Sequence, residues 1–374
     1  MKLIINTSNL YVGGGLQVAI SFINELRLLD VDYDFHIFLS KAANKQIDQK
    51  SFPSNFNFYL IEKSPSSLAH RKEIIKQLDK LEESIQPNVV FSIFGPTFWT
   101  PKTVHVMGFA LPWLINPDSS AFGQLSFLKR VKKRIENLYK AYFIKKNADF
   151  YVTETEDTKF RLSKFHKINE DKIFVVGNTY SSYFNEPINQ NTSLPERQIS
   201  EFRLVTISHN YPHKNLKIIK EIILYLKEQP IQYKFILTID QESYESLFSD
   251  VQDYVITLKP INTDLCPSVY DQCDALFLPT LLECFTASYP EAMKMKKPIL
   301  TSDLSFAKDI CKDSALYFDP LDAKNIADKI IELSTNKQLQ NDLIVKGAER
   351  LSEMETAESR AKKYLKICEN IALT

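Results

Sequence analysis

Short runs of β-branched and aromatic residues alternate along the chain with longer segments in which apolar residues recur at helical spacing. In the first half, strands are predicted at residues 3–6, 35–39, 89–94, 104–107, 150–153 and 173–176. In the second half, strands are predicted at residues 204–207, 234–238, 254–257, 275–279, 298–301 and 316–318. Because strands that alternate with helices form parallel sheets covered by helices, the pattern predicts an α/β fold.

A polar, proline-bounded stretch without periodicity interrupts this alternation at residues 186–195, which is typical of an interdomain linker. A chain of 374 residues is also long enough for two or three domains. We therefore expect two α/β domains and a helical end of the chain. The predicted parts are a first domain at 1–185, a linker at 186–202, a second domain at 203–355 and a terminal helix at 356–374.

The composition excludes several classes of protein. Hydrophobic residues make up 44% and charged residues 25%, as in an average globular protein. The 46 basic and 46 acidic side chains balance, which argues against a dedicated nucleic-acid binder. The five cysteines show no Cys-x-x-Cys spacing, and no run of about 18 apolar residues occurs. We expect a cytosolic chain with reduced thiols.

A glycine cluster follows the first predicted strand. Gly13, Gly14 and Gly15 are three of only eight glycines, and a helix is expected to begin near Leu16 and to include Gln17. Their spacing does not fit the Gly-x-Gly-x-x-Gly dinucleotide fingerprint. Exposed backbone N–H groups at a helix start bind anions or sugar hydroxyls. The cluster therefore indicates either such a binding loop or a flexible strand-to-helix turn.

Two carboxylates follow the strand predicted at 275–279. Glu283 and Glu291 are eight residues apart, which on one helix would give an offset of about 80° and a rise of about 12 Å. The two side chains would then not converge. With Glu283 in a loop and Glu291 in the helix, both can line one pocket at the carboxyl edge of the sheet, where ligands bind in open parallel sheets.

These residues resemble the retaining glycosyltransferases of family 4, whose GT-B architecture has two Rossmann-like domains that face each other across a cleft. The resemblance covers nearly the whole chain. It implies that the first domain binds the acceptor, that the second binds the donor, and that the terminal helix at 356–374 crosses back to the first domain. Its most specific element is the Glu-x₇-Glu motif from Glu283 to Glu291, followed by residues 297–303, which are similar to the strand and loop after the motif. Weaker matches are the 13–15 glycine loop, residues 176–178 and residues 213–216.

The resemblance implies roles for individual residues. Glu291 would bind the ribose of the donor, and Glu283 would bind the donor sugar. The backbone amides of Phe285 and Thr286 would hold the sugar and the diphosphate. Lys214 would neutralise charge that develops on the departing diphosphate, which stabilises the transition state more than the ground state.

The chain departs from the family pattern at three places. The usual Glu-Gly-Phe-Gly is Glu-Cys-Phe-Thr here, so Cys284 and Thr286 add side chains near the donor sugar. The diphosphate-binding arginine is missing, and the resemblance leaves His209 or His213 for that role. Asn178 matches a donor-contacting Asn-Gly turn, but threonine follows it.

Two further features concern catalysis and metal binding. His105 is expected at the end of a strand, where the family often places a histidine near the reacting carbon; the alternative is a buried core histidine. Asp30 and Asp32 resemble the metal-binding Asp-x-Asp of other glycosyltransferases. They precede the strand at 35–39 and so fall at the amino edge of the sheet, and we expect no metal site.

Residues 129–146 carry eight basic side chains and one acid, Glu136. An apolar stripe at helical spacing runs along the same segment: Phe127, Val131, Ile135, Leu138 and Tyr142. We expect this stripe to pack on the first domain. The basic side chains indicate either a solvated face or contact with an anionic membrane or a lipid-diphosphate acceptor.

The sequence therefore predicts a retaining, metal-independent glycosyltransferase that needs no cofactor besides its substrate. The donor would be a UDP- or GDP-linked sugar, and the acceptor a hydroxyl of a glycan or a lipid-linked molecule in surface polysaccharide synthesis. The expected location is cytoplasmic or peripheral on the inner face of the plasma membrane. Two alternatives stay open: a sugar-nucleotide epimerase or hydrolase of the same fold, and a catalytically silent nucleotide-sugar binding subunit.

Overall fold

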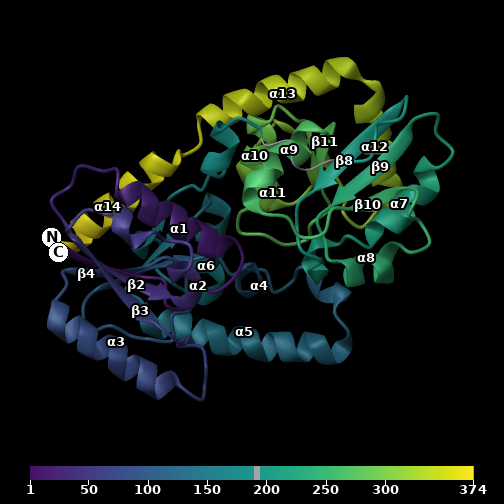
Figure 1. Ribbon diagram of the computed structural model, residues 1–374. Helices are drawn as coiled ribbons and strands as arrows, with labels where there is room; N and C mark the ends of the chain where they lie inside the picture. The colour runs from purple at the N-terminus through teal and green to yellow at the C-terminus, as the bar shows by residue number, and fades with distance from the viewer. Residues whose placement is uncertain (189–193, 374) are drawn as a thin grey trace. The chain divides into compact units, whose positions relative to one another are not determined.

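The computed structural model describes residues 1–188 and 194–373, and contacts divide the chain into two compact units (Figure 1). The first unit comprises Met1–Ile115, Val131–Asn178 and Glu355–Thr374, and the second comprises Asn116–Arg130 and Thr179–Met354. The first unit thus ends at Asn178, earlier than the predicted linker at 186–202. The predicted linker residues 189–193 lie outside the described residues.

The first unit contains a parallel sheet of seven strands in the order β3-β2-β1-β4-β5-β6-β7. Its strands are β1 (Lys2–Asn6), β2 (Asp34–Ser40), β3 (Phe56–Ile61), β4 (Val89–Ser92), β5 (His105–Phe109), β6 (Phe150–Thr153) and β7 (Ile173–Val175). Strand β1 lies between β2 and β4 and is apolar on both faces, so Leu3, Ile4 and Ile5 are all fully buried.

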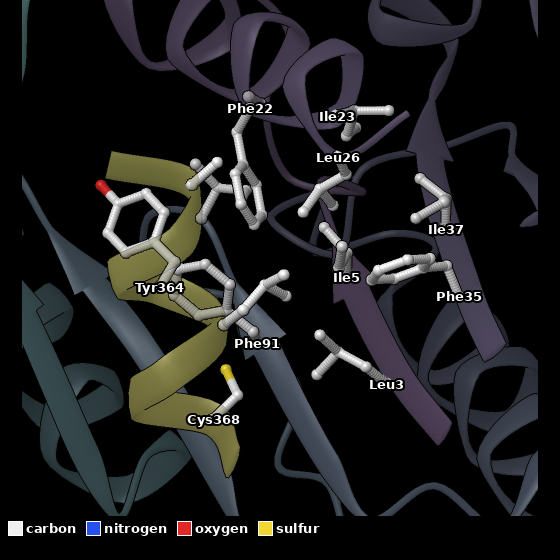
Figure 2. Close-up of a cluster of buried hydrophobic side chains, with 14 of the residues drawn as sticks. Leu3, Ile5, Phe22, Ile23, Leu26, Phe35, Ile37, Phe91, Tyr364 and Cys368 are labelled. Carbon is white, nitrogen blue, oxygen red and sulfur yellow. The ribbon is translucent and has the colours of Figure 1, made fainter. Parts of the chain in front are cut away.

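The helices of the first unit cover this sheet. They are α1 (Gly14–Leu26), α2 (Lys41–Asn44), α3 (Arg71–Ile85), α4 (Pro112–Ile115), most of α5 (Phe127–Asn147), α6 (Glu156–His166) and α14 (Ala357–Ala372). Helix α14 packs on α1 and β4, as predicted for the terminal helix. Figure 2 shows Tyr364 and Cys368 of α14 beside Phe22 and Phe91, and the ring centroids of Phe22 and Tyr364 lie 5.1 Å apart.

The second unit contains a parallel sheet of six strands in the order β10-β9-β8-β11-β12-β13. Its strands are β8 (Glu201–Thr206), β9 (Gln232–Leu237), β10 (Val255–Thr257), β11 (Ala275–Leu278), β12 (Ile299–Ser302) and β13 (Ala315–Phe318). Its helices are α7 (Ile218–Leu226), α8 (Gln241–Phe248), α9 (Cys266–Asp271), α10 (Ser288–Lys294), α11 (Ser305–Cys311), α12 (Ala323–Thr335) and α13 (Lys337–Ser352). In both sheets the strand order reverses beside the first strand, as in Rossmann folds.

The structure corrects three sequence-based expectations. Strand β3 was not predicted. The helical end of the chain is two helices, and α14 begins at a capping box in which Thr356 and Ser359 bond each other's backbone N–H groups. The segment Asn116–Arg130, which we assigned to the first domain, packs with the second unit.

The apolar stripe of α5 is a fourth correction, because it does not pack on the first unit. All five of its side chains, from Phe127 to Tyr142, are exposed to solvent. The helix begins within the second unit and continues in the first from Val131 onward. In the described residues, no helix is both long and apolar enough to span a membrane.

Candidate functional site

The two central strands of the second sheet, β8 and β11, end at the same edge and are followed by the loops that carry the candidate residues. Parallel neighbours bring their carboxyl ends together, and the strand order reverses at this pair. Lys214 ends the short 3₁₀ helix η5 (Pro212–Lys214) after β8, and Glu283 lies in the loop after β11. This position is where open α/β sheets bind their ligands.

Hydrogen bonds hold the two loops together. The backbone N–H of Leu281 donates to the carbonyl of His213 over 2.7 Å, and the Thr280 hydroxyl oxygen lies 3.2 Å from the same carbonyl. Asn215 follows η5 in the left-handed conformation with φ of 55°, which asparagine tolerates well. Its buried amide donates to the carbonyl of Pro320 over 2.8 Å. The turn that presents Lys214 is therefore fixed by backbone and side-chain bonds.

Lys214 and Glu283 form an ion pair between these loops. The side chains are only 14% and 10% exposed, so solvent screens the charges little. The hydroxyl of Thr280 donates a second hydrogen bond to the paired Glu283 oxygen, at 3.0 Å. The arrangement presents one cation and one carboxylate side by side at the carboxyl edge of the sheet.

Glu291 lies on α10 and is buried. The hydroxyl of Tyr270, from α9, donates to its Oε2 over 3.2 Å and lies 3.3 Å from the carbonyl of Ser288. Burial raises the pKa of Glu291 to about 7, while the hydrogen bond from Tyr270 acts in the opposite direction. At neutral pH this carboxyl is consequently poised between its neutral and ionised forms.

The segment between the two glutamates follows the predicted loop-to-helix arrangement. Cys284 is buried, whereas Phe285 and Thr286 are half-buried. The Thr286 hydroxyl accepts a hydrogen bond from the backbone N–H of Ser288 over 3.4 Å. Neither Cys284 nor Thr286 is among the described residues with positive φ, so replacing the family's glycines does not strain this loop.

Tyr211 contacts both histidines that the resemblance leaves for the diphosphate. His209 is exposed, with its ring centroid 5.7 Å from that of Tyr211. The His213 ring stacks on Tyr211, with the ring centroids 5.6 Å apart and an interplanar angle of 6°. His213 also contributes its carbonyl to the loop bonds described above, so it supports the loop that carries Lys214.

The glycine cluster lies at the matching position of the first sheet, in the loop after β1. Gly13 has φ of 79° and caps α1, and a Cβ atom at Gly13 or Gly14 would meet nothing within 4 Å. At Gly15 a Cβ atom would lie 3.2 Å from the ring of Phe94. Gln17 is exposed and bonds Gln46 over 3.2 Å. The loop is therefore open at the carboxyl edge of β1.

Asn178 lies in the first unit, and a buried network engages its amide. The amide nitrogen donates to Glu154 over 2.7 Å, and the amide oxygen accepts from Arg360 of α14. Arg360 also donates to the hydroxyl of Ser21 on α1 over 2.8 Å. This network fastens α14 to the first unit, a structural role that sequence analysis did not predict for Asn178.

His105 corrects a further expectation. It does not lie at the carboxyl end of a strand but is the first residue of β5, at the amino edge. Its ring is fully buried, with Nε2 2.7 Å from the Ser92 hydroxyl and Nδ1 bonded to the Asn147 carbonyl. Burial lowers the pKa of His105 to about 4. The residue is a core histidine, and the positional argument for a catalytic role is wrong.

Three residues that hold this site were not predicted. Thr280 bonds Glu283, and Tyr270 bonds Glu291; Ser119 donates to the carbonyl of Leu281 over 3.2 Å. The place of Thr280 directly after a strand was the only available signal. Within the described residues, no group of three or more His, Cys, Asp or Glu side chains could hold a metal ion.

Comparisons with solved structures identify the fold of the chain. A glycosyltransferase from Rickettsia africae superposes with a TM-score of 0.73 at 14% identity and covers 99% of this chain and 98% of its own. The Anabaena protein HepE, in a complex with UDP-glucose, gives a TM-score of 0.71 at 13% identity, with 99% and 100% covered. The chain therefore has the GT-B fold.

Residues 195–350 match the family model described as glycosyl transferases group 1. The matched region lies in the second unit and includes Lys214, Glu283 and Glu291. The O-antigen chain mannosyltransferase RfbU of Salmonella typhimurium is 22% identical over 200 residues, which are 51% of this chain and 53% of the relative. The match thus spans about half the length of that relative.

Proposed function

We propose that the chain is a glycosyltransferase that moves a sugar from a UDP- or GDP-linked donor to a hydroxyl of a glycan or lipid-linked acceptor. The observation that carries this proposal is the buried Lys214–Glu283 ion pair at the switch point of the second sheet, inside the region that matches the glycosyltransferase family model. The O-antigen name of the curated relative supports a place in surface polysaccharide synthesis.

The donor would take over both partners of the ion pair. Glu283 would accept hydrogen bonds from sugar hydroxyls, and Lys214 would face the diphosphate. Glu291 would bind the ribose hydroxyls, with Tyr270 holding its carboxylate. The amides of Phe285 and Thr286 would complete the contacts to sugar and phosphate. In this assignment, each charged group of the site meets a complementary group of a nucleotide sugar.

The proposed reaction proceeds with retention of anomeric configuration. The acceptor oxygen forms a bond to the anomeric carbon on the face from which the diphosphate leaves. The bond between that carbon and the phosphate oxygen breaks, and its electron pair stays on this phosphate oxygen. The proton of the acceptor hydroxyl passes to the same phosphate oxygen of the departing diphosphate. Lys214 stabilises the negative charge as it grows, which lowers the barrier without a metal ion or a cofactor.

A thermal-shift panel with UDP, GDP, ADP and NAD, each with EDTA and with magnesium, tests donor binding. Saturation at about a hundredfold excess over Kd should stabilise the protein by about 2.7 kcal/mol. We expect a metal-independent shift with UDP or GDP that is lost in Glu291→Ala. The exposed Glu242 of α8 provides the matched control, Glu242→Ala, which should keep the shift. A shift that survives in Glu291→Ala would disprove the assigned nucleotide site.

Product analysis separates transfer from the two alternatives. The nucleotide identified by the panel is supplied as its sugar conjugates, with and without glycan acceptors, and the products are examined by NMR. Transfer with the donor's anomeric configuration is expected. Conversion or hydrolysis of the donor without an acceptor would indicate the epimerase or hydrolase. Binding without turnover would indicate the silent subunit, and an inverted product would refute retention.

A further inference from the structure

The apolar stripe of α5 is the largest set of exposed hydrophobic side chains on one described helix. Its members, with the neighbouring Leu128, are exposed in the structure. Ile135 and Leu138 are 63% and 73% exposed, values usual for lysine and glutamate rather than for isoleucine and leucine. Exposed apolar groups that gather on one face, rather than being scattered singly, mark an interaction surface.

Contacts on the other side of α5 show that the stripe faces away from the first unit. Ile144 is fully buried, and the amide of Asn137 donates to the Trp113 carbonyl over 2.9 Å. On a helix with about 100° per residue, Ile144 and Asn137 lie roughly 140° and 120° from the middle of the stripe. The helix is therefore held on the unit by one face and presents the stripe on a different face.

Basic side chains border the stripe on both sides. By the same helical geometry, Lys145 lies at one margin, and Lys132 and Lys146 lie at the other; all three are exposed. Glu136, the single acid of the segment, pairs with Lys133 and Lys140 on the side of the helix away from the stripe. The margins of the stripe are consequently positive, and no acid interrupts them.

We propose that this face of α5 binds the surface of an anionic lipid bilayer, with the stripe in the acyl boundary and the bordering lysines at the headgroups. A helix of 21 residues with an apolar face between basic margins suits such an interface. A second copy of the chain is a poorer partner, because pairing of two stripes would bring their basic margins together. This binding is independent of the proposed transferase activity.

Vesicle flotation of the full chain tests the proposal. One set of vesicles is phosphatidylcholine alone, and in the other phosphatidylglycerol replaces about a third of it. Binding is expected to the anionic set and to weaken as salt is added, because exposed charges are screened. Absence of binding to the anionic vesicles, or equal binding to both sets at all salt concentrations, would overturn the proposal.

Variants distinguish binding through the stripe from nonspecific binding through any exposed apolar side chain. The double variant Ile135→Ser/Leu138→Ser should lose binding, with its circular dichroism and melting temperature retained because both side chains already face solvent. Leu224→Ser is the matched control, since Leu224 is 61% exposed on α7 of the second unit. This control should bind like the wild type. Equal loss in the control, or no loss in the double variant, would contradict the proposal.

The triple variant Lys132→Gln/Lys145→Gln/Lys146→Gln measures how much the lysines at the margins of the stripe contribute to vesicle binding. Each lysine near an anionic surface contributes about 1 kcal/mol, so affinity for the anionic vesicles should fall at least tenfold. Size-exclusion chromatography at several protein concentrations tests the alternative that the stripe binds a second copy of the chain. A dimer that is lost in Ile135→Ser/Leu138→Ser, without vesicle binding by the wild type, would assign the stripe to a second copy instead.

Discussion

The ammonium of Lys214 and the carboxylate of Glu283 are paired in the second unit although they are 69 positions apart in the chain. The pair exists only because β8 and β11 are neighbours in the sheet and release their loops at the same edge. Since the side chains are largely buried, each charge depends on the other for compensation. Removing one partner is more costly than removing both.

The first prediction concerns this pair. Lys214→Met and Glu283→Gln should each lower the free energy of unfolding by about 1–3 kcal/mol, because each leaves a buried polar group without its partner. The loss of free energy of unfolding in the double variant should be smaller than the sum of the losses in the two single variants. Urea denaturation of the four proteins measures the coupling, which we expect to exceed about 1 kcal/mol. Turnover should fall on the order of a hundredfold in either single variant.

The exposed ion pair between Lys308 and Asp303 provides the control for this cycle. Both of its side chains are about half exposed, so solvent screens the interaction. The cycle of Lys308→Met and Asp303→Asn should give a coupling below about 0.5 kcal/mol. Equal coupling in the two cycles would show that burial does not strengthen the Lys214–Glu283 pair.

The second prediction concerns the buried carboxyl of Glu291, whose pKa is raised to about 7. The carboxyl ionises near pH 4.5 in the unfolded chain but near pH 7 in the folded one, so its protonated form favours folding. This stabilisation is fully present below pH 4.5 and is lost as pH rises through about 7. Glu291→Gln should remove that dependence and be more stable than the wild type at pH 8 by about 1–3 kcal/mol.

Urea denaturation at pH 5 and pH 8 checks the Glu291 prediction. The free energy of unfolding of Glu291→Gln, relative to that of the wild type, should be higher at pH 8 than at pH 5. Glu242→Gln, at an exposed position on α8, should show no such change. A constant difference at both pH values would mean that Glu291 ionises in the folded protein as it does in water.

The third prediction concerns Arg360, which joins α14 to Asn178 and to Ser21. Its side chain is buried, so Arg360→Met leaves the amide of Asn178 without this partner in a dry environment. We expect a loss of about 2–4 kcal/mol in the free energy of unfolding. The measurement is chemical denaturation followed by circular dichroism.

Arg197→Met provides the matched control for Arg360. Arg197 forms two hydrogen bonds with Asp274, at 2.8 and 3.0 Å, but is 41% exposed. Its replacement should cost less than about 1 kcal/mol because water substitutes for the lost bonds. If both variants lost the same stability, the buried network of Arg360 would contribute no more than a surface pair.

The sequence was sufficient for the α/β alternation because most strands are continuous apolar runs bounded by turns, such as Leu3–Ile5 of β1. Strand β3 was missed, since its aromatic run is interrupted by Asn57 and lies at an edge of the sheet with several half-exposed positions. Glu283 and Glu291 could be identified from their spacing and from the resemblance to the family motif. The roles of Thr280 and Tyr270 could not be predicted, because tertiary packing brings these hydrogen-bond donors to the glutamates without any regular spacing in the sequence.

Periodicity alone could not establish where the apolar stripe of α5 points. A helix that buries its apolar face and one that exposes it have the same sequence pattern. The segment Asn116–Arg130 raises the same difficulty, because the bond from Ser119 to Leu281 joins residues 162 positions apart. No local composition change marks such a long-range contact. Strand-end position also failed for His105, because the strand end at which it lies is the amino end of β5, and ligands of parallel sheets bind at the carboxyl ends.

The last prediction compares two glycines of the first unit. A Cβ atom at Gly108 of β5 would lie 1.8 Å from the carbonyl oxygen of Ile93, which backbone atoms cannot accommodate without a shift. Gly108→Ala should therefore lower the free energy of unfolding by more than about 2 kcal/mol. A Cβ atom at Gly14 meets nothing within 4 Å. Gly14→Ala should leave stability unchanged or raise it by up to about 1 kcal/mol, since alanine favours helices.

The same Gly14 variant tests the proposed role of the glycine loop. If a ligand approaches the bare backbone at the start of α1, an added methyl group obstructs it while the fold remains intact. We expect Gly14→Ala to keep the nucleotide thermal shift of the second unit and to lose transfer to the acceptor. Steady-state kinetics with varied acceptor measure this effect. Unchanged kcat/KM for the acceptor would show that the cluster is only a turn, the alternative left open by the sequence.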